Sequence, residues 1–413
     1  MQKNQDAFLK TEVLVIAILD KMDGLNKARK QFMLHIFQLF LGLRGRYNFL
    51  NMARYGTYSE QSYRNHFEKD FDFSRFNQEL ISQFCSSDMI VAFDPSYVPK
   101  SGTKTDHLGK FWSGCSGKAL KGLEMGGFAV VDVANQTAMS LESVQTPSAK
   151  ELAMEGKSLV DHYAQIVVER AETIVNYCLY LVVDSYFCKK RFIHPIQQNT
   201  RLEIVSKMRN DANLNYLYEG PQKKGRGRHK KYNGKVDVKN IDKSRFKLCL
   251  EEEGLRVYSA IVYSVSLKQK VRIAYVQQLK KGTPSGKYAI LFSTDLELNP
   301  ELILRYYKAR FQIEFLFRDA KQHVGLNHAQ ARSEQKLNFH FNAALTTVSI
   351  AKAIFFLDLQ PHQRKSFSMR NVKTLFLNRL MIERFLSNFQ IDRNEEKNNH
   401  IYRRLLNWGK IAA

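Results

Sequence analysis

The sequence contains little cysteine. Five cysteines are spread through 413 residues without a C-x-x-C pair, and an odd number cannot all pair within one chain. This pattern argues against a disulfide framework and against a cysteine-based zinc site, so we expect reduced, buried cysteines of a cytoplasmic protein. They are Cys85, Cys115, Cys178, Cys188 and Cys249.

Long apolar runs are also missing. Asp20 and Lys21 interrupt the stretch VLVIAILDKM before it reaches the length of a membrane span. The stretch QFMLHIFQLFLGLRGR carries His35 and Gln38, which predicts a buried helix. The segment MQKNQDAFLK has no apolar run, so we expect no signal peptide and no membrane partner.

Acidic residues are scarce relative to basic ones. The chain has 40 Asp and Glu against 63 Lys and Arg, a formal net charge of +23. Because the basic residues extend over the whole chain, they favour nucleic acid over a membrane surface, which usually binds one amphipathic helix. A hydrophobic content of 44% allows a substantial core, and the length allows two or three domains.

The first 80 or so residues show the helical period of apolar side chains. Thr57 or Ser59 can cap a helix with the sequence EQSYRNHFEK. Arg64 and Asn65 fall on its polar positions, where they would contact DNA or form an ordinary solvated helix face.

The pattern changes to strands from residue 89. MIVAFD predicts a short buried strand that ends at Asp94 and is stopped by Pro95, and CLYLVVD predicts another that ends at Asp184. With the segments around them, the predicted order is β-β-β-α-β-α-β. This order matches an α/β fold of the ribonuclease-H-like class, a mixed sheet flanked by helices, in which the first and fourth strands are neighbours.

Residues 219–239 form a glycine-rich basic tract without an apolar period. We expect an exposed loop here, either held against DNA phosphates or simply solvated. Arg226, Arg228 and Lys230 are its candidate contacts. Alternating segments that follow predict an inserted block of antiparallel β-strands before residue 299.

One stretch, YYKARFQIEFLFRDAKQH, places basic and phenolic residues around a single carboxylate. If it forms one helix, five side chains fall within an arc of about 80°. They are Tyr307, Arg310, Glu314, Arg318 and Lys321. Such a row is either an ion-pair ladder on a solvated face or a metal-binding carboxylate beside bound phosphate.

These motifs resemble a DDE transposase of a bacterial insertion sequence, of the cut-and-paste branch with the Y-x2-R-x3-E-x6-K signature. Tyr307, Arg310, Glu314 and Lys321 reproduce every spacing of that signature. FDPSYVPKSG at Asp94 and VVDSYF at Asp184 resemble the two aspartate blocks of the family. The resemblance covers about residues 85–350.

The resemblance implies a catalytic centre of Asp94, Asp184 and Glu314. These carboxylates would hold two Mg²⁺ ions, with Mn²⁺ as a substitute, and Asp94 would bridge the two. Arg310 and Lys321 would bind phosphates near the cut, and Tyr307 would contact a phosphate or a terminal base. We expect Arg318, which is outside the signature, to be a surface charge or an ion-pair partner of Glu314.

The resemblance also implies a domain plan, a reaction and partners. The plan is a helical DNA-end-binding domain (1–84), a catalytic core in two parts (85–218 and 299–350), the basic loop and strand insertion (219–298), and a helical C-terminal region suited to dimerisation (351–413). The enzyme would cleave double-stranded DNA at the terminal inverted repeats and join the 3′-OH ends to target DNA as a homodimer. We expect it in the bacterial cytoplasm.

Two alternatives remain open from the sequence. One is an inactive, element-derived DNA-binding regulator, and the other is a non-transposing nuclease of the same fold. Some relatives pass through a hairpin intermediate and hold a flipped base with an aromatic residue. The inserted strands offer tyrosines and phenylalanines, such as Tyr258 and Phe292, but no tryptophan.

Overall fold

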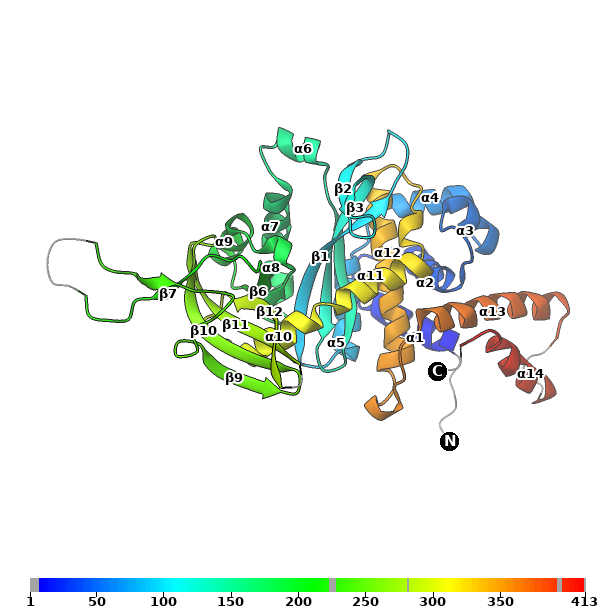
Figure 1. The fold of residues 1–413 in the computed structure, drawn as a ribbon. Coiled ribbons are helices and arrows are strands. Elements are labelled where there is room, and N and C mark those ends of the chain that lie inside the picture. Colours follow the sequence, from blue (N-terminus) through cyan, green and yellow to red (C-terminus); the bar gives the residue numbers. More distant parts are fainter. Residues whose placement is uncertain (1–6, 223–227, 281, 392–395, 412–413) are drawn as a thin grey trace. The chain divides into compact units, whose positions relative to one another are not determined.

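The computed structural model describes residues 7–222, 228–280, 282–391 and 396–411 (Figure 1). The chain divides into two compact units. Unit 1 comprises residues 1–87, 95–148 and 313–413, and unit 2 comprises residues 88–94 and 149–312. Each unit therefore contains segments that are distant in the sequence.

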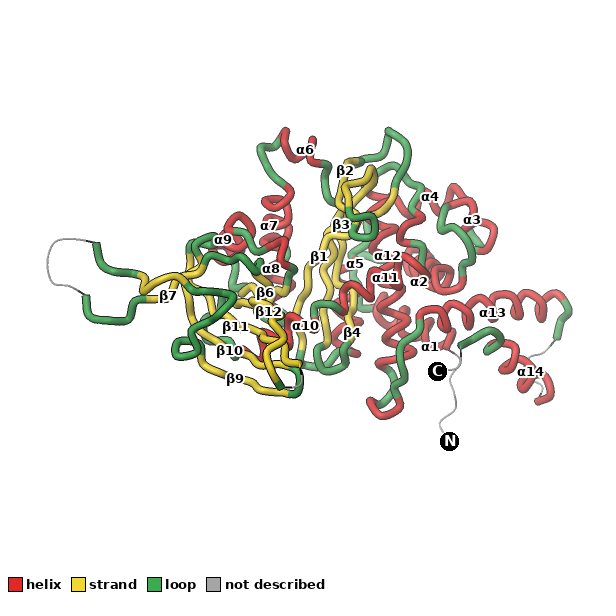
Figure 2. Tube along the Cα trace, in the orientation of Figure 1, coloured by secondary structure: helices red, strands yellow, loops and turns green. Residues whose placement is uncertain are grey.

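Unit 2 is built on a long mixed sheet (Figure 2). Its strands are the first half of β1 (Met89–Pro99), β5 (Tyr180–Val182), β6 (Glu203–Met208), β7 (Leu214–Leu217), β8 (Tyr232–Lys235), β9 (Lys247–Glu252), β10 (Leu255–Ser264), β11 (Gln269–Lys280) and β12 (Thr283–Ser293). The order is β1-β5-β6-β12-β11-β10-β7-β8, with β9 on β10. The expected insertion is confirmed as antiparallel strands, and it extends the catalytic sheet because β12 pairs with β6.

The helices of unit 2 are α6 (Ala149–Met154), α7 (Leu159–Glu169), α8 (Ala171–Val175), α9 (Lys190–Asn199) and α10 (Pro300–Ala309), with the short 3-10 turn η1 (Ser185–Phe187). The first helix of the predicted β-β-β-α-β-α-β order, taken as one long amphipathic helix over residues 150–172, is wrong because three helices occupy this stretch. Gly156 has a positive φ of 69°, and Ser158 starts α7 in a capping box with Asp161. These local signals stop one helix and begin the next.

Unit 1 surrounds a smaller set of strands with helices. The strands are the second half of β1, β2 (Gly109–Ser113), β3 (Lys118–Asp132) and β4 (Thr137–Gln145), where β2 and β4 both pair with β3. The end of β1 lies against β3, since a Cβ on Gly122 would come within 2.5 Å of the Tyr97 ring. Strand β1 continues to Pro99, so the prediction that Pro95 ends it is wrong. The pairing of β1 with β5 ends at Ala92, so this pairing needs no N–H from Pro95.

The helices of unit 1 are α1 (Ala7–Asp20), α2 (Lys27–Gly42), α3 (Phe49–Tyr55), α4 (Glu60–Glu68), α5 (Phe73–Phe84), α11 (Gln312–His323), α12 (Glu334–Lys352), α13 (Met369–Asn388) and α14 (Glu396–Leu406), with short turns η2 (Leu326–His328), η3 (Ala353–Leu357) and η4 (Pro361–Gln363). The predicted helical character of the first 84 residues is confirmed, and Ser59 caps α4 as expected. Helix α12 is the core helix.

Buried polar contacts attach α12 to strand β4. The Asn342 amide accepts a hydrogen bond from the Ser143 backbone N–H at 2.8 Å and donates one to the Ser143 carbonyl at 2.8 Å. The stretch Glu334–Leu357 is long and apolar enough for a membrane span, but 89% of its apolar window is buried inside the protein. Its composition therefore reflects its place in the core.

The cysteines are free thiols, as expected. The prediction that all are buried is wrong for Cys115, which is exposed, and the other four are partly buried. Cys115 lies in the turn between β2 and β3, a hairpin that the sequence reading missed.

We predict that Asn342→Leu destabilises the protein by at least about 2 kcal/mol, because it leaves a buried donor and a buried acceptor of β4 without their partner. Urea unfolding measures this difference. Gln335→Leu, an amide-to-leucine change on an exposed position of the same helix, serves as the control. Equal losses in the two variants would contradict the role of Asn342.

Candidate active site

Two aspartates end up in register on neighbouring parallel strands of unit 2. Val91 pairs with Leu181 and Ala92 with Val182, so two residues further on Asp94 stands level with Asp184. Side chains two residues apart on a strand point to the same face. Both aspartates are half-buried. The expected adjacency of the first and fourth strands is thereby confirmed.

The backbone of Asp184 is fixed from two sides. Its side chain caps the turn η1 by accepting a hydrogen bond from the Tyr186 N–H at 2.8 Å. Its carbonyl accepts a hydrogen bond from the Ser206 hydroxyl on β6 at 2.8 Å. The carboxylate position is therefore set by β6 as well as by β5.

A cation also lies near this turn. The Lys189 ammonium is 3.5 Å from the centre of the Tyr186 ring. Burial lowers the pKa of Lys189, and the charge of Asp184 opposes that shift. The negative charge of Asp184 therefore favours the protonated form of Lys189.

The aspartate pair fits a hard divalent cation. Two carboxylates at one level on one face offer the oxygen ligands that Mg²⁺ or Mn²⁺ prefers. Across the described part of the chain, no group of three or more His, Cys, Asp or Glu could hold a metal ion. The donor set within unit 2 is therefore the pair itself, and Glu314 belongs to unit 1.

The expected single helix around Glu314 is wrong. Helix α10 ends at Ala309 and α11 begins at Gln312. The Phe311 N–H bonds to the Lys308 carbonyl at 3.3 Å, an i→i−3 contact that tightens the chain between the helices. Tyr307 is in α10, and Arg310 is in the break. Glu314, Arg318 and Lys321 are in α11, so the five residues are not on one continuous helix.

Tyr307 and Arg310 belong to unit 2. Arg310 is only 9% exposed, and its guanidinium carbon lies 5.8 Å from the centre of the Tyr307 ring. Tyr307 is half-buried. These two members of the signature form a packed cation–π pair.

Glu314, Arg318 and Lys321 belong to α11 of unit 1. Glu314 lies half-buried in its first turn. The Lys321 ammonium donates a hydrogen bond to the Tyr97 carbonyl at 2.9 Å, which attaches α11 to the second half of β1. Arg318 is a surface charge, as expected, and its ion-pair partner is Asp319 at 3.4 Å.

The predicted DNA contacts on α4 are exposed but engaged within the helix. Arg64 pairs with Glu60 at 2.5 Å and lies 4.9 Å from the Phe49 ring centre. Asn65 accepts a hydrogen bond from the Gln61 amide at 2.8 Å. Contact of either residue with DNA stays a prediction.

The basic tract lies between β7 and β8, which pair as a hairpin that extends away from the rest of unit 2 (Figure 1). Arg228 and Lys230 are exposed, and Arg226 is outside the described residues. The Lys230 ammonium is 4.5 Å from the Tyr218 ring centre. Most described residues of the tract are exposed, as expected, but Val236 is buried, and Tyr232–Lys235 form a strand instead of a loop.

The two halves of β1 join two strand sets that together define the class of fold. Unit 1 has β4 and the end of β1 on either side of β3, and unit 2 has the start of β1 beside β5 and then β6. This order, with helices around the strands and aspartates on β1 and after β5, is that of a ribonuclease-H-like fold.

Residues 109–350, more than half of the chain, match the family described as the transposase DDE domain. The chain belongs to this family of transposases. The matched range contains Asp184 and Glu314 and begins after Asp94.

No protein of curated function matches the sequence. Among solved structures, the chain is similar to a piggyBac transposase, determined by cryo-EM as a synaptic complex with hairpin DNA. The identity is 12% and the TM-score 0.37, with 99% of this chain and 84% of that chain covered. Because this superposition is loose, the fold class rests on the strand order.

Sequence reasoning missed Lys207 and Ser206. Both lie on β6, where Leu181 pairs with Ile204 and Val182 with Val205. Extending this register by two residues places Lys207 level with Asp184. The alternation in RLEIVSKMR predicted the strand, but the register with β5 was needed to find the lysine.

We predict that Mn²⁺ raises the melting temperature of the wild-type protein, because a bound cation relieves repulsion between Asp94 and Asp184 and binds only the folded state. Saturation at a hundred times the dissociation constant contributes about 2.7 kcal/mol. Asp184→Asn should lose the shift, whereas Glu252→Gln, at an exposed carboxylate of β9, should keep it. Identical melts with and without Mn²⁺ in the wild type would overturn the metal site.

Proposed function

We propose that this protein is a cut-and-paste DNA transposase. It binds the terminal inverted repeats of an insertion sequence, cleaves them by metal-dependent phosphodiester hydrolysis, and joins the 3′-OH ends to target DNA. The observation that carries the proposal is the Asp94–Asp184 pair, which stands in register on β1 and β5 of a chain in the transposase DDE domain family.

The proposed metal ligands are Asp94, Asp184 and Glu314. When bound, a pair of divalent cations activates water for attack on phosphorus and stabilises the leaving oxygen. The protein's part is to hold the ligands: β1 and β5 set the two aspartates, and Ser206 fixes the backbone of Asp184. Glu314 is proposed from its place in the Y-x2-R-x3-E-x6-K signature, whose spacings are all intact.

Arg310, Lys321 and Tyr307 are the proposed phosphate contacts at the cut. Arginine offers a planar fork of donors for two phosphate oxygens, and an ammonium has three donors. The Lys321 ammonium also donates a hydrogen bond to the Tyr97 carbonyl at 2.9 Å. The Tyr307 ring packs near Arg310 and would orient it.

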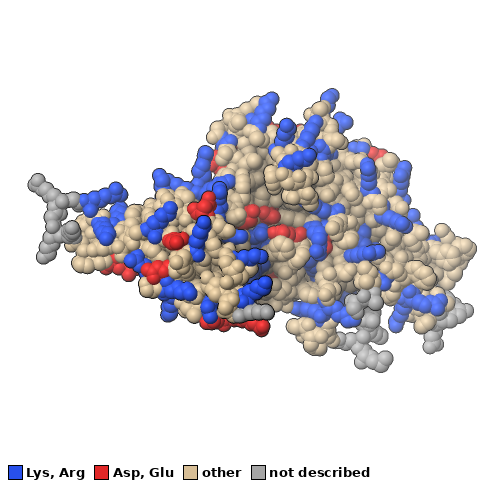
Figure 3. All heavy atoms as spheres, viewed as in Figure 1, with Lys and Arg blue, Asp and Glu red and all other residues tan. Residues whose placement is uncertain are grey.

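The wider DNA surface is supported by charge. Lys and Arg side chains are spread over the visible face of the protein among uncharged residues (Figure 3), in keeping with the net charge of +23. Arg228 and Lys230 beside the β7–β8 hairpin, together with Arg64 and Asn65 on α4, are the proposed backbone contacts. Such contacts fix register on DNA without reading its sequence.

A homodimer on DNA is also part of the proposal, because two element ends must be held together. Helix α13 supports it with exposed apolar side chains at helical spacing. Met381 is 59% exposed, Phe385 55% and Phe389 65%. A helix face of this kind is suited to packing against a second copy.

We predict that the wild-type protein with Mg²⁺ nicks a plasmid carrying the DNA that flanks its reading frame, and that Asp94→Ala, Asp184→Ala and Glu314→Ala each abolish nicking. Gel electrophoresis of the plasmid measures it. Glu301→Gln, an exposed carboxylate in the first turn of α10, should retain full activity.

The outcomes separate the alternatives. Binding without metal-dependent nicking, unchanged by Asp94→Ala, would make the protein a DNA-binding regulator. A second reaction uses a pre-cut element end and a target plasmid. Cleavage in the first reaction without joining in the second would assign the protein as a nuclease.

A further inference from the structure

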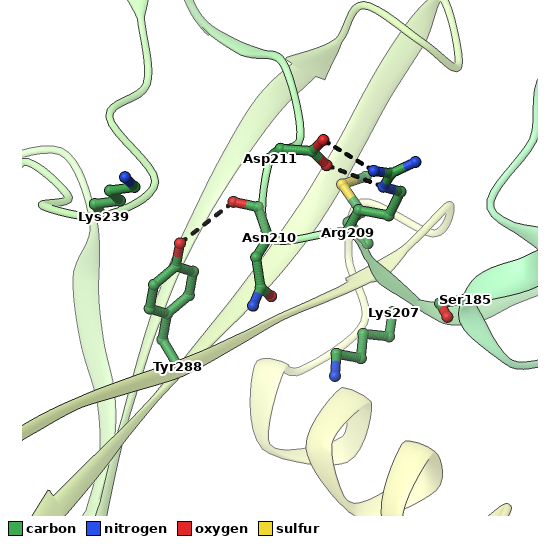
Figure 4. Close-up of a pocket in the computed structure, with 8 residues that line it drawn as sticks. Ser185, Lys207, Arg209, Asn210, Asp211, Lys239 and Tyr288 are labelled. Carbon is green, nitrogen blue, oxygen red and sulfur yellow. Dashed lines mark hydrogen bonds and ion pairs between the residues drawn. The ribbon is translucent and has the colours of Figure 1, made fainter.

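A cavity of about 490 Å³ lies beside Asp184 within unit 2. Its wall includes Ser185, the residue after the aspartate, and the loop that follows β6 (Figure 4). Eight residues line it: Ser185, Lys207, Met208, Arg209, Asn210, Asp211, Lys239 and Tyr288. None of them belongs to the signature motif of the family.

The register of the sheet places one of these residues in line with the catalytic pair. Asp94, Asp184 and Lys207 stand level on the adjacent parallel strands β1, β5 and β6. Lys207 directly follows Ser206, whose hydroxyl holds the Asp184 carbonyl. Strand β6, which fixes the backbone of Asp184 through Ser206, therefore also places Lys207 next to the aspartate pair.

The lining of the cavity favours an anion. Lys207, Arg209 and Lys239 contribute three positive charges, and Asp211 contributes one negative charge. Arg209 is paired with Asp211 at 3.1 Å, and both side chains are largely exposed. The two lysines therefore supply the net positive charge of the wall.

One wall of the cavity is rigid. The Tyr288 hydroxyl donates a hydrogen bond to the Asn210 carbonyl at 3.3 Å (Figure 4). The Tyr288 ring stacks on Tyr275 with centroids 5.2 Å apart. Strand β12 thus fixes the loop after β6 in position. The volume of about 490 Å³ is that of a small-molecule site, which suits one nucleotide.

We infer that this cavity holds one nucleotide of a DNA strand by its phosphate, on Lys207 and Lys239, beside the cleavage centre. The inference rests on the proposed function for the identity of the strand. The inference adds Lys207 as a positioning residue. Its contact with the phosphate would fix the DNA strand relative to Asp184, on the side of β6.

Site-directed cross-linking tests the assignment without metal or cleavage. Ser185→Cys introduces a thiol into the cavity wall, and the probe is a single-stranded oligodeoxynucleotide with a disulfide-activated tether on one phosphate. In EDTA, we predict efficient cross-linking to this thiol. Adding Lys207→Gln and Lys239→Gln should lower the yield at least about fivefold, since each lysine removed takes away a charged phosphate contact.

Two controls separate the cavity from general attraction to a basic protein. Lys247→Gln with Lys270→Gln removes two exposed lysines outside the cavity and should leave the yield unchanged. Ser266→Cys, an exposed thiol outside the cavity, should react weakly. Equal yields at the two thiols, or equal losses in the two lysine pairs, would overturn the inference, as would competition by inorganic pyrophosphate as strong as that by unmodified oligonucleotide.

The cross-linking result is independent of the nicking assay. If Asp184→Ala abolishes nicking but the cross-linking yield does not change when Lys207 and Lys239 are replaced, the transposase proposal stands and the cavity assignment fails. If cross-linking follows the two lysines but no metal-dependent nicking occurs, the cavity binds a DNA strand and the cleavage proposal fails.

Discussion

The parallel register of β1, β5 and β6 is the constraint on which the candidate site depends. Because the strands run in the same direction, residues that end each apolar run arrive at one edge of the sheet. A shift of one residue would turn one side chain of the row to the opposite face. The register is held by the buried apolar pairs Ala92 with Val182 and Val182 with Val205, and by the Ser206 hydroxyl on the Asp184 carbonyl. The chemistry is thus positioned by packing that takes no part in it.

The signature residues are divided between the two compact units. The chain passes between the units four times: after residues 87, 94, 148 and 312. Asp94, Asp184 and Arg310 belong to unit 2, whereas Glu314 and Lys321 belong to unit 1. The last passage, after Gln312, falls at the start of α11, directly after the break between α10 and α11.

The sequence was sufficient for the strands that carry the aspartates, although it missed β2, because the buried strands at Asp94 and Asp184 have a local apolar pattern. It was insufficient where the deciding contact is distant in the chain. Nothing local marks the break at Arg310 and Phe311, since no glycine or proline lies there. Likewise, Lys207 reads as an ordinary polar position of a strand until the pairing of β6 with β5 places it beside Asp184. The prediction at Pro95 failed for the same reason. Proline has no N–H, so it ends a strand only where a neighbouring strand would need a hydrogen bond from that position.

The central claim is that strand register brings Asp94 and Asp184 to one cation. Anomalous diffraction from crystals of the full chain grown with Mn²⁺ and an element-end oligonucleotide measures this directly. The account predicts a manganese peak within coordinating distance of both carboxylates. A peak bound to only one of them, or manganese found only elsewhere on the protein, would contradict it.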